Sequence, residues 1–176
     1  MSSIVRDNVV CLYQAVDLLQ CLHEETFSKP VDSCFGSSIG GHIRHNIDHY
    51  YCFLKGLDTG VINYDARLRD QAVESNPGKA TACLLDIIES LNDLVAKNLD
   101  QKISVYTDAA VPEPESKAVE STLGRELQFL LSHTVHHFAL IAIIAHTLNI
   151  SVQPDFGVAP STLKYRQHAN ENSPCA

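Results

Sequence analysis

The sequence lacks several patterns that indicate common classes of function. Lysine and arginine never form a run, and 13 basic residues face 21 acidic ones, giving a formal net charge of -8. A protein that neutralises a phosphate backbone needs a basic patch, so we expect no nucleic-acid partner. The most apolar stretch, from Phe138 to Ile144, is flanked by histidines and is too short to cross a bilayer. We therefore expect no membrane span.

Three catalytic motifs are missing as well. The sequence has no glycine-rich phosphate loop and no Gly-x-Ser-x-Gly turn, so it gives no indication of the phosphate sites and serine nucleophiles that use them. In the zinc-peptidase pattern His-Glu-x-x-His, a glutamate follows the first histidine. Here Thr134 follows His133. A peptidase of that type is not expected.

The first residues and the cysteines point to one compartment. The chain opens without a charged region followed by an apolar one, so we expect a cytoplasmic protein. Among its six cysteines no Cys-x-x-Cys pair occurs. Those within apolar helical patterns are Cys11, Cys21, Cys52 and Cys83. Their positions predict buried thiols in a reducing compartment, and Cys34, in a loop, is the candidate for a functional thiol.

Length and composition predict one globular domain. The chain has 176 residues, of which 45% are hydrophobic and 19% charged. Apolar residues at steps of three and four predict helices over residues 4–26, from Ser37 or Ser38 to residue 57, over 80–99, and from Ser121 or Thr122 to residue 149. Serine and threonine at those positions can cap the helix that follows.

The connections between these helices complete the predicted fold. A long crossover covers residues 58–78, and alternating residues at 102–107 and 117–122 predict a small β-hairpin around the Pro-Glu-Pro-Glu turn before the last helix. The fold class is therefore all-α, an antiparallel four-helix bundle in residues 1–150. Residues 151–176 form a C-terminal extension that we expect to be partly disordered.

Six of the nine histidines lie in two short runs, one on the second predicted helix and one on the fourth: His42, His45 and His49, and His133, His136 and His137. On a helix with about 100° per residue, His133 and His137 lie about 40° apart, so both can reach one ion. The second helix must supply a third ligand, and His45 is the middle histidine of its run. His42, His49 and His136 are expected to lie outside the ligand set.

Other polar residues near these runs have two interpretations each. Glu126, two turns before His133, is either a solvated carboxylate or a group that reaches the site as hydrogen-bond acceptor or acid-base. Arg44 and Asp48 have the spacing of a surface ion pair. Candidates for orienting a substrate at the mouth of the bundle, each with a packing or surface role as the alternative, are Tyr50, Tyr64, Arg67 and Arg69.

These motifs resemble the DinB/YfiT-like superfamily of metal-dependent enzymes, which are four-helix bundles with a three-histidine site. The resemblance is carried by Ser38-Ile-Gly-Gly-His-Ile-Arg-His45 and by His133-Thr-Val-His-His137. It implies that His45, His133 and His137 are the metal ligands, and that the protein is a homodimer. Many relatives continue with Arg-Gly-Gln where this chain has Phe138-Ala-Leu.

Three histidine ligands leave a coordination position open, as in catalytic metal sites. The ion is expected to be zinc, nickel or iron, and it would lower the pKa of a bound water or thiol. The resemblance implies a small-molecule substrate, such as a low-molecular-weight thiol, and a thiol-dependent transferase or a hydrolase. The alternatives are a non-catalytic metal-binding or stress-response bundle and an interaction bundle without metal.

Overall fold

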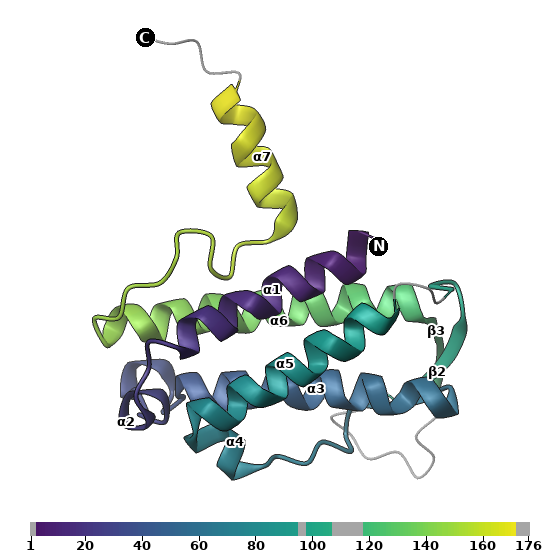
Figure 1. Ribbon diagram of the computed structural model, residues 1–176, viewed down its shortest axis with the longest axis horizontal. Helices are drawn as coiled ribbons and strands as arrows, with labels where there is room; N and C mark the ends of the chain where they lie inside the picture. Colours follow the sequence, from purple (N-terminus) through teal and green to yellow (C-terminus); the bar gives the residue numbers. More distant parts are fainter. Residues whose placement is uncertain (1–2, 95–97, 107–117, 172–176) are drawn as a thin grey trace.

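A computed structural model describes residues 3–94, 98–106 and 118–171 (Figure 1). Within these residues the longest helices are α1 (Ser3–Leu19), α3 (Ile39–Thr59), α5 (Pro77–Asp93) and α6 (Leu123–Thr147). The shorter elements are α2 (Glu24–Phe27), the 3-10 helix η1 (Asp32–Cys34), β1 (Val61–Asn63), α4 (Gln71–Ser75), β2 (Lys102–Tyr106), β3 (Val119–Thr122) and α7 (Pro160–Glu171). The prediction of a mainly helical fold is confirmed.

Capping side chains start three of the long helices, at predicted caps for α3 and α6 and, for α5, at Asn76, so that α5 begins at Pro77 rather than at the predicted residue 80. Ser38 Oγ accepts from the Gly41 amide at 3.0 Å at the start of α3. Asn76 Oδ1 accepts from the Lys79 amide at 2.8 Å before α5. Thr122 Oγ1 accepts from the Arg125 amide at 3.2 Å before α6. Each of these bonds satisfies an amide that has no partner inside its helix.

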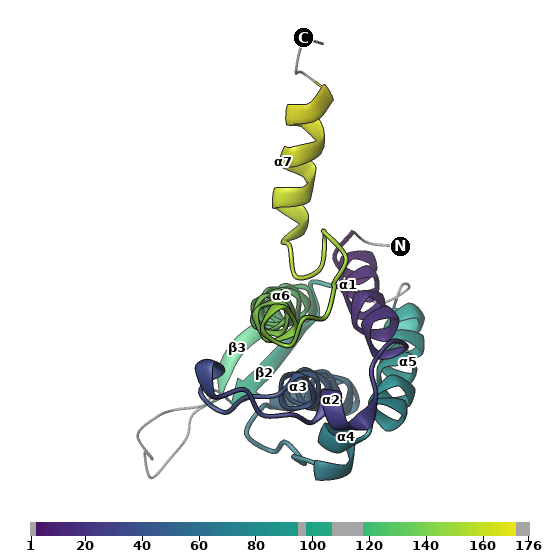
Figure 2. The ribbon, with the colours of Figure 1, turned by 90° about the vertical axis from the view of Figure 1, so that its left-hand side faces the viewer.

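The long helices pack side by side, α1 and α3 each contacting both α5 and α6 (Figures 1 and 2). The predicted antiparallel arrangement applies to two of these pairs, α1 with α5 and α3 with α6. The other two pairs run in the same direction. Near the start of both α1 and α6, for example, Asn8 Nδ2 donates to the Leu127 carbonyl at 3.1 Å. The long crossover between α3 and α5 permits this order because it returns the chain to the starting end of α3.

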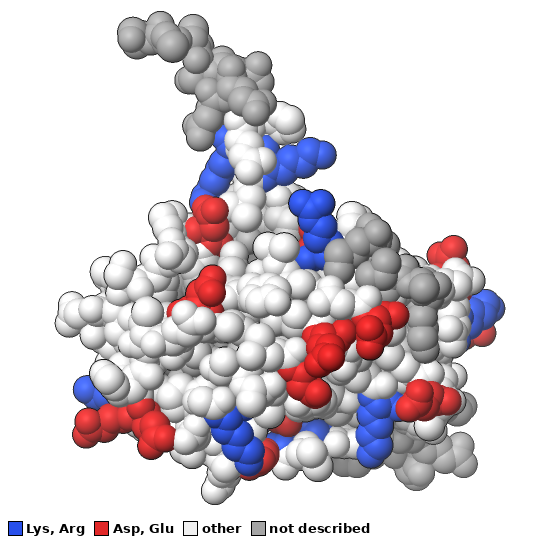
Figure 3. All heavy atoms as spheres, in the orientation of Figure 1, with Lys and Arg blue, Asp and Glu red and all other residues white. Residues whose placement is uncertain are grey.

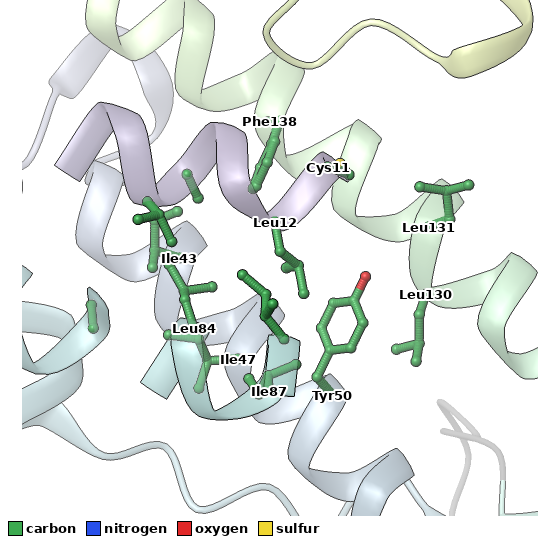
Figure 4. Close-up of a cluster of buried hydrophobic side chains, with 14 of the residues drawn as sticks. Cys11, Leu12, Ile43, Ile47, Tyr50, Leu84, Ile87, Leu130, Leu131 and Phe138 are labelled. Atoms are coloured by element: carbon green, nitrogen blue, oxygen red, sulfur yellow. The ribbon is translucent and has the colours of Figure 1, made fainter. Parts of the chain in front are cut away.

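Apolar residues from all four long helices meet in one core. Figure 4 shows Leu12 of α1, Ile47 of α3, Ile87 of α5 and Leu130 of α6 among its side chains, and each is at most 2% exposed. Burying a side chain of this size stabilises a fold by about 1.5 to 3 kcal/mol. The apolar periodicity in the sequence therefore identified the packed face of each long helix.

A three-stranded sheet extends beyond the predicted hairpin. Strands β2 and β3 pair antiparallel as expected, and the turn predicted between them lies outside the described residues. Strand β1 pairs parallel to β2 and was not predicted, because three residues are too few to show an alternation. It lies against α3 at Gly56, where an added Cβ would come within 2.5 Å of Ile62 Cγ1.

The C-terminal extension contains a helix that the sequence pattern did not predict. Phe156 stacks on Phe138 of α6, with ring centroids 4.9 Å apart and planes 7° from parallel. Beyond this contact, α7 projects away from the other helices (Figures 1 and 2), and its described side chains are largely exposed. Residues 172–176 lie outside the described part, and the domain boundary near residue 150 stays a prediction.

Within the described residues, α6 is one helix long and apolar enough to cross a membrane, with a mean hydropathy of 1.5 over its most apolar window. That window is 39% buried, and α6 packs against α1 and α3. The core helix of a soluble protein also passes this test of length and composition, so α6 by itself is weak evidence for a membrane span. On the face seen in Figure 3, lysines and arginines are scattered among acidic and uncharged residues.

The described cysteines form no disulfide with one another. Cys11 is buried as predicted, and burial raises the pKa of its thiol to about 12. The expectation of a buried thiol is wrong for Cys21, which is exposed because it follows the end of α1. Cys34 is partly buried.

Candidate metal centre

The two histidine runs face each other between α3 and α6. Because these helices are antiparallel, early residues of α3 lie opposite late residues of α6. His42 Nδ1 lies 2.9 Å from His137 Nδ1, and His45 Nε2 lies 2.9 Å from His133 Nε2. The helix packing therefore brings together two runs that are about ninety residues apart in the sequence, as the helical spacing predicted.

Three of these histidines form a group that could hold a metal ion. One ring nitrogen from each of His45, His49 and His133 lies within 4.8 Å of the other two. An ion bound at about 2.0 to 2.1 Å from its ligands holds two nitrogens roughly 3 Å apart, so the 2.9 Å pair of His45 and His133 already has ligand spacing. The three side chains together could therefore hold a divalent ion.

His49 belongs to this group, although the sequence predicts that it lies outside the ligand set. Its Nδ1 lies 2.8 Å from the His45 carbonyl oxygen, which can only accept, so Nδ1 carries the proton and Nε2 carries the lone pair. Metal-binding histidines commonly have one nitrogen anchored in this way. The four-residue spacing of His45 and His49, the same as that of His133 and His137, is compatible with this position but does not determine the rotation of α3 that produces it.

His137 lies beside the group rather than in it. Its ring centroid is 4.5 Å from those of both His45 and His133, while its Nδ1 pairs with His42. His136 is exposed, at a centroid distance of 5.1 Å from His137. The ligand set His45, His133 and His137 therefore stays a prediction, with His49 as a competitor for the third place.

Burial keeps the clustered imidazoles neutral. Loss of solvent, followed by the repulsion of neighbouring histidines, lowers the pKa of His45 to about 2, of His133 to about 4 and of His137 to about 3. The pKa of His42 is lowered for the same reasons. At neutral pH these side chains therefore keep the lone pairs with which imidazole binds metals.

A cavity of about 670 Å³ adjoins the metal-binding group. It is lined by His45, His49 and His133 and by Tyr64, Arg67, Val105, Val119, Glu120, Ser121, Arg125, Glu126 and Phe129. A second cavity of about 380 Å³ is lined by His42 and His137 among others, and His45 borders both. The larger cavity has the size of a small-molecule site and gives a ligand access to the three histidines.

Glu126 lies in the wall of the larger cavity. It is 7% exposed and accepts hydrogen bonds from Tyr64 Oη at 2.9 Å and from Ser121 Oγ at 2.6 Å. Burial and the nearby Glu126 carboxylate raise the pKa of Tyr64, which keeps its hydroxyl protonated as a donor. The interpretation of Glu126 as a solvated carboxylate is wrong, because these two donors replace water.

The four candidate substrate-orienting residues divide evenly. Tyr64 and Arg67 line the larger cavity, and Arg67 Nη1 donates to His49 Nε2 at 3.2 Å. Arg69 is exposed and lies outside the lining. Tyr50 is fully buried and belongs to the core. Phe129, which the sequence analysis missed, stacks on the His133 ring at 5.5 Å.

A buried polar network fixes α3 and α6 relative to each other behind the histidines. Tyr50 Oη donates to Asn8 Oδ1 at 2.6 Å, and Thr134 Oγ1 lies 3.3 Å from Tyr50 Oη. Tyr50 follows His49 and Thr134 follows His133. Since buried polar groups lose free energy without partners, this network favours one rotational setting of the two helices.

A second polar contact holds the beginning of α3, which carries His42 and His45. The predicted ion pair is present, with Arg44 Nη1 3.0 Å from Asp48 Oδ2, but the expectation of a surface pair is wrong, because the side chains of Arg44 and Asp48 are only 18% and 6% exposed. Arg44 Nε also bonds Glu74 Oε2 of α4 at 3.0 Å. The pair therefore joins α3 to α4 as well as bridging two turns of α3.

Comparison with known proteins gives a limited result. No family model matches the chain. The chain is similar to "FK506-binding protein 5" of Rhizopus delemar, with 30% identity over 105 residues. This match covers 60% of the chain and 27% of that protein, so the chain spans about a quarter of the length of the relative. A match over so small a part of the relative does not assign the chain to a family.

Proposed function

We propose that the chain is a DinB-like four-helix metalloenzyme whose divalent ion is held by His45, His133 and a third histidine between α3 and α6. The observation that carries this proposal is the group of three ring nitrogens within 4.8 Å of one another at the wall of a 670 Å³ cavity. All-histidine ligation suits zinc, nickel or iron(II).

We assign the third place to His49. Its Nδ1 is anchored to the His45 carbonyl, and its Nε2, which now accepts from Arg67 Nη1, would be the ligand atom. His49 belongs to the group of nitrogens within 4.8 Å, whereas His137 Nδ1 pairs with His42. The test is the zinc affinity of His49→Ala beside His137→Ala, with exposed His146→Ala as the control. Loss of a ligand should weaken binding at least tenfold. If His49 is the third ligand, His49→Ala should lose more zinc affinity than His137→Ala. If the ligand set implied by the resemblance is right, His137→Ala should lose more.

The residues around the cavity suit transfer or hydrolysis. A divalent ion supplies a Lewis acid that lowers the pKa of a bound thiol or water. Glu126, held by Tyr64 and Ser121, is positioned to take a proton from a group bound in the cavity. We therefore propose a metal-dependent transferase, with a low-molecular-weight thiol as one substrate, or a hydrolase.

The alternative is a bundle that binds metal without catalysis. The enzyme is favoured because the three histidines open onto a cavity that also contains a buried carboxylate, whereas a structural site is closed by a fourth protein ligand. Circular dichroism and turnover after metal removal separate the two. An enzyme stays helical and regains thiol-dependent or hydrolytic turnover with added metal. A structural metal protein unfolds, and restoring its metal gives no turnover.

The homodimer and the cytoplasmic location remain proposals as well. Exposed apolar side chains on the adjacent helices α1 and α6 support a dimer, among them Val10, Tyr13 and Ile143, which are 55%, 45% and 56% exposed. Light scattering of the full chain tests this. A dimer that Tyr13→Glu converts to a monomer supports the interface, and a monomeric wild-type chain refutes it.

A further inference from the structure

We propose that Asn46 is a positioning residue of the metal centre, whose buried side-chain amide hydrogen-bonds the ring of His137 when an ion is bound. This inference rests on the proposed metal site. It adds a residue outside the ligand set and outside the linings of both cavities, which the spacing of the histidines does not indicate.

The first argument is the state of the Asn46 side chain. Asn46 is 1% exposed, and neither its Nδ2 nor its Oδ1 has a hydrogen-bond partner among the described residues. Buried amides are nearly always paired, because an amide taken out of water without a partner destabilises the fold. A leucine of similar size would avoid this loss. Residues that break such a rule gather at functional sites, so the amide indicates a bound state in which it has partners.

The second argument is the place of Asn46 on α3. His42, Asn46 and Tyr50 are four residues apart, so they lie along one stripe of the helix. Both ends of this stripe contact α6: His42 Nδ1 lies 2.9 Å from His137 Nδ1, and Tyr50 Oη lies 3.3 Å from Thr134 Oγ1. Asn46, between these two contacts, therefore faces the turn of α6 that runs from Thr134 to His137.

The third argument is the effect of an ion on His137. Its ring centroid lies 4.5 Å from those of His45 and His133, so an ion held by these two histidines lies beside it. A cation favours an imidazole that turns its lone pair towards the charge and its N–H away from it. The N–H of His137 then needs a new acceptor, and Asn46 Oδ1 supplies one.

An amide suits this exchange because it both donates and accepts. His42 Nδ1 and His137 Nδ1 contact each other in the structure, so one of them donates and the other accepts. When His137 turns, His42 loses this partner, and Asn46 Nδ2, one turn later on α3, donates to it instead. Ion binding thus replaces a direct contact between two histidines by a bridge through Asn46, which fixes the His137 ring against His45 and His133.

The test is the zinc affinity of Asn46→Leu in the untagged full chain, measured by competition with a chelator of known affinity. Leucine has a similar volume but neither donates nor accepts a hydrogen bond. Asn46→Leu should bind zinc roughly tenfold more weakly than wild type, the lower end of the loss expected when an outer hydrogen-bond partner of a metal site is removed. Ile47→Leu is the matched control, because Ile47 is the next residue of α3 and is 2% exposed in the core. Its zinc affinity should stay close to that of wild type.

Two further measurements separate a positioning role from a general structural one. In the His137→Ala background, Asn46→Leu should cause no additional loss of zinc affinity, because the amide acts through the His137 ring. Without metal, Asn46→Leu should unfold at the same temperature as wild type or at a higher one, because it removes an unpaired buried amide.

Three results would each overturn the inference: equal zinc affinities of Asn46→Leu and wild type, a loss that persists in the His137→Ala background, or weaker zinc binding together with a lower unfolding temperature of the metal-free variant. A wild-type chain that binds no zinc would instead refute the metal site itself.

Discussion

Replacing Gly40 by alanine should destabilise the protein through one identifiable contact. Gly40 lies in the first turn of α3, where that helix meets α4. An added Cβ would lie 2.0 Å from the Glu74 carbonyl oxygen and 3.0 Å from Phe27 Cε1. Since Cβ contacts under 3.0 Å essentially never occur, α4 would have to move by about 1 Å, the difference between 3.0 and 2.0 Å.

The adjacent glycine provides a control of the same composition. A Cβ at Gly41 would meet Ser38 Oγ at 3.3 Å and Glu74 Oε1 at 3.6 Å, both of them side-chain atoms that can adjust. Both alanine variants gain about the same helix propensity, so that term largely cancels in their difference. Overpacking against a backbone costs about 1 to 3 kcal/mol, and we expect Gly40→Ala to be less stable than Gly41→Ala by that amount.

Thermal unfolding measures this difference directly. For a chain of this size, 1 kcal/mol corresponds to roughly 2 to 4 °C in the unfolding midpoint. Gly40→Ala should therefore unfold several degrees below Gly41→Ala under identical conditions. Equal midpoints for the two variants would show that α4 does not press against α3 as described, and that the start of the histidine helix is positioned by other contacts.

Three further predictions concern the extension, the core and the histidines. Gly157→Ala should loosen the extension and accelerate its proteolysis, since Gly157 has a φ of 69° and an added Cβ would lie 2.7 Å from the Ala139 amide nitrogen. Gly36→Ala is the control, because Gly36 has a φ of 70° but nothing within 4 Å of an added Cβ, so this variant shows the effect of backbone strain alone. Asn46→Leu should raise the free energy of unfolding by about 1 to 3 kcal/mol in urea titrations, because this side-chain amide is 1% exposed and has no hydrogen-bond partner in the described residues. A lower free energy of unfolding in the variant would contradict this reasoning. Without metal, acidification should destabilise the chain. The pKa values of His45 and His133 are about 2 and 4 in the folded chain against 6.5 for an ordinary histidine, so the unfolded chain binds more protons and stability falls as pH drops from about 6.5 towards 4. Replacing both histidines by asparagine should make the thermal unfolding midpoint depend less on pH between pH 7.5 and 5. An unchanged dependence of the midpoint on pH would show that these histidines are not its cause.

Local signals in the sequence predicted what local physics determines. Ser38 and Thr122 cap the two histidine helices because a hydroxyl at that position can accept from the third amide of the helix. The opposition of His45 and His133 followed from helical spacing once the two helices were assumed to pack. The sequence therefore predicted the mainly helical fold and the two helices that contribute histidines to the candidate site.

Contacts between distant segments could not be predicted in the same way. Glu126 is buried because Tyr64, 62 residues earlier, donates to its carboxylate. His49 enters the metal-binding group because of the particular rotation of α3, which the spacing of a run leaves undetermined. Helix α7 has a weak apolar pattern that gives no signal in the sequence, and the segment before it is held by the packing of Phe156 against Phe138.

The central claim is that His45 and His133 hold a divalent ion, and metal content tests it most directly. The full chain, purified without a histidine tag and equilibrated with zinc, is measured by elemental analysis beside a His45→Ala, His133→Ala double variant. His146→Ala serves as a control, because His146 is exposed at the end of α6. We predict one ion per chain in the wild type and in the control and much less than one in the double variant. One ion per chain in the folded double variant would contradict the account.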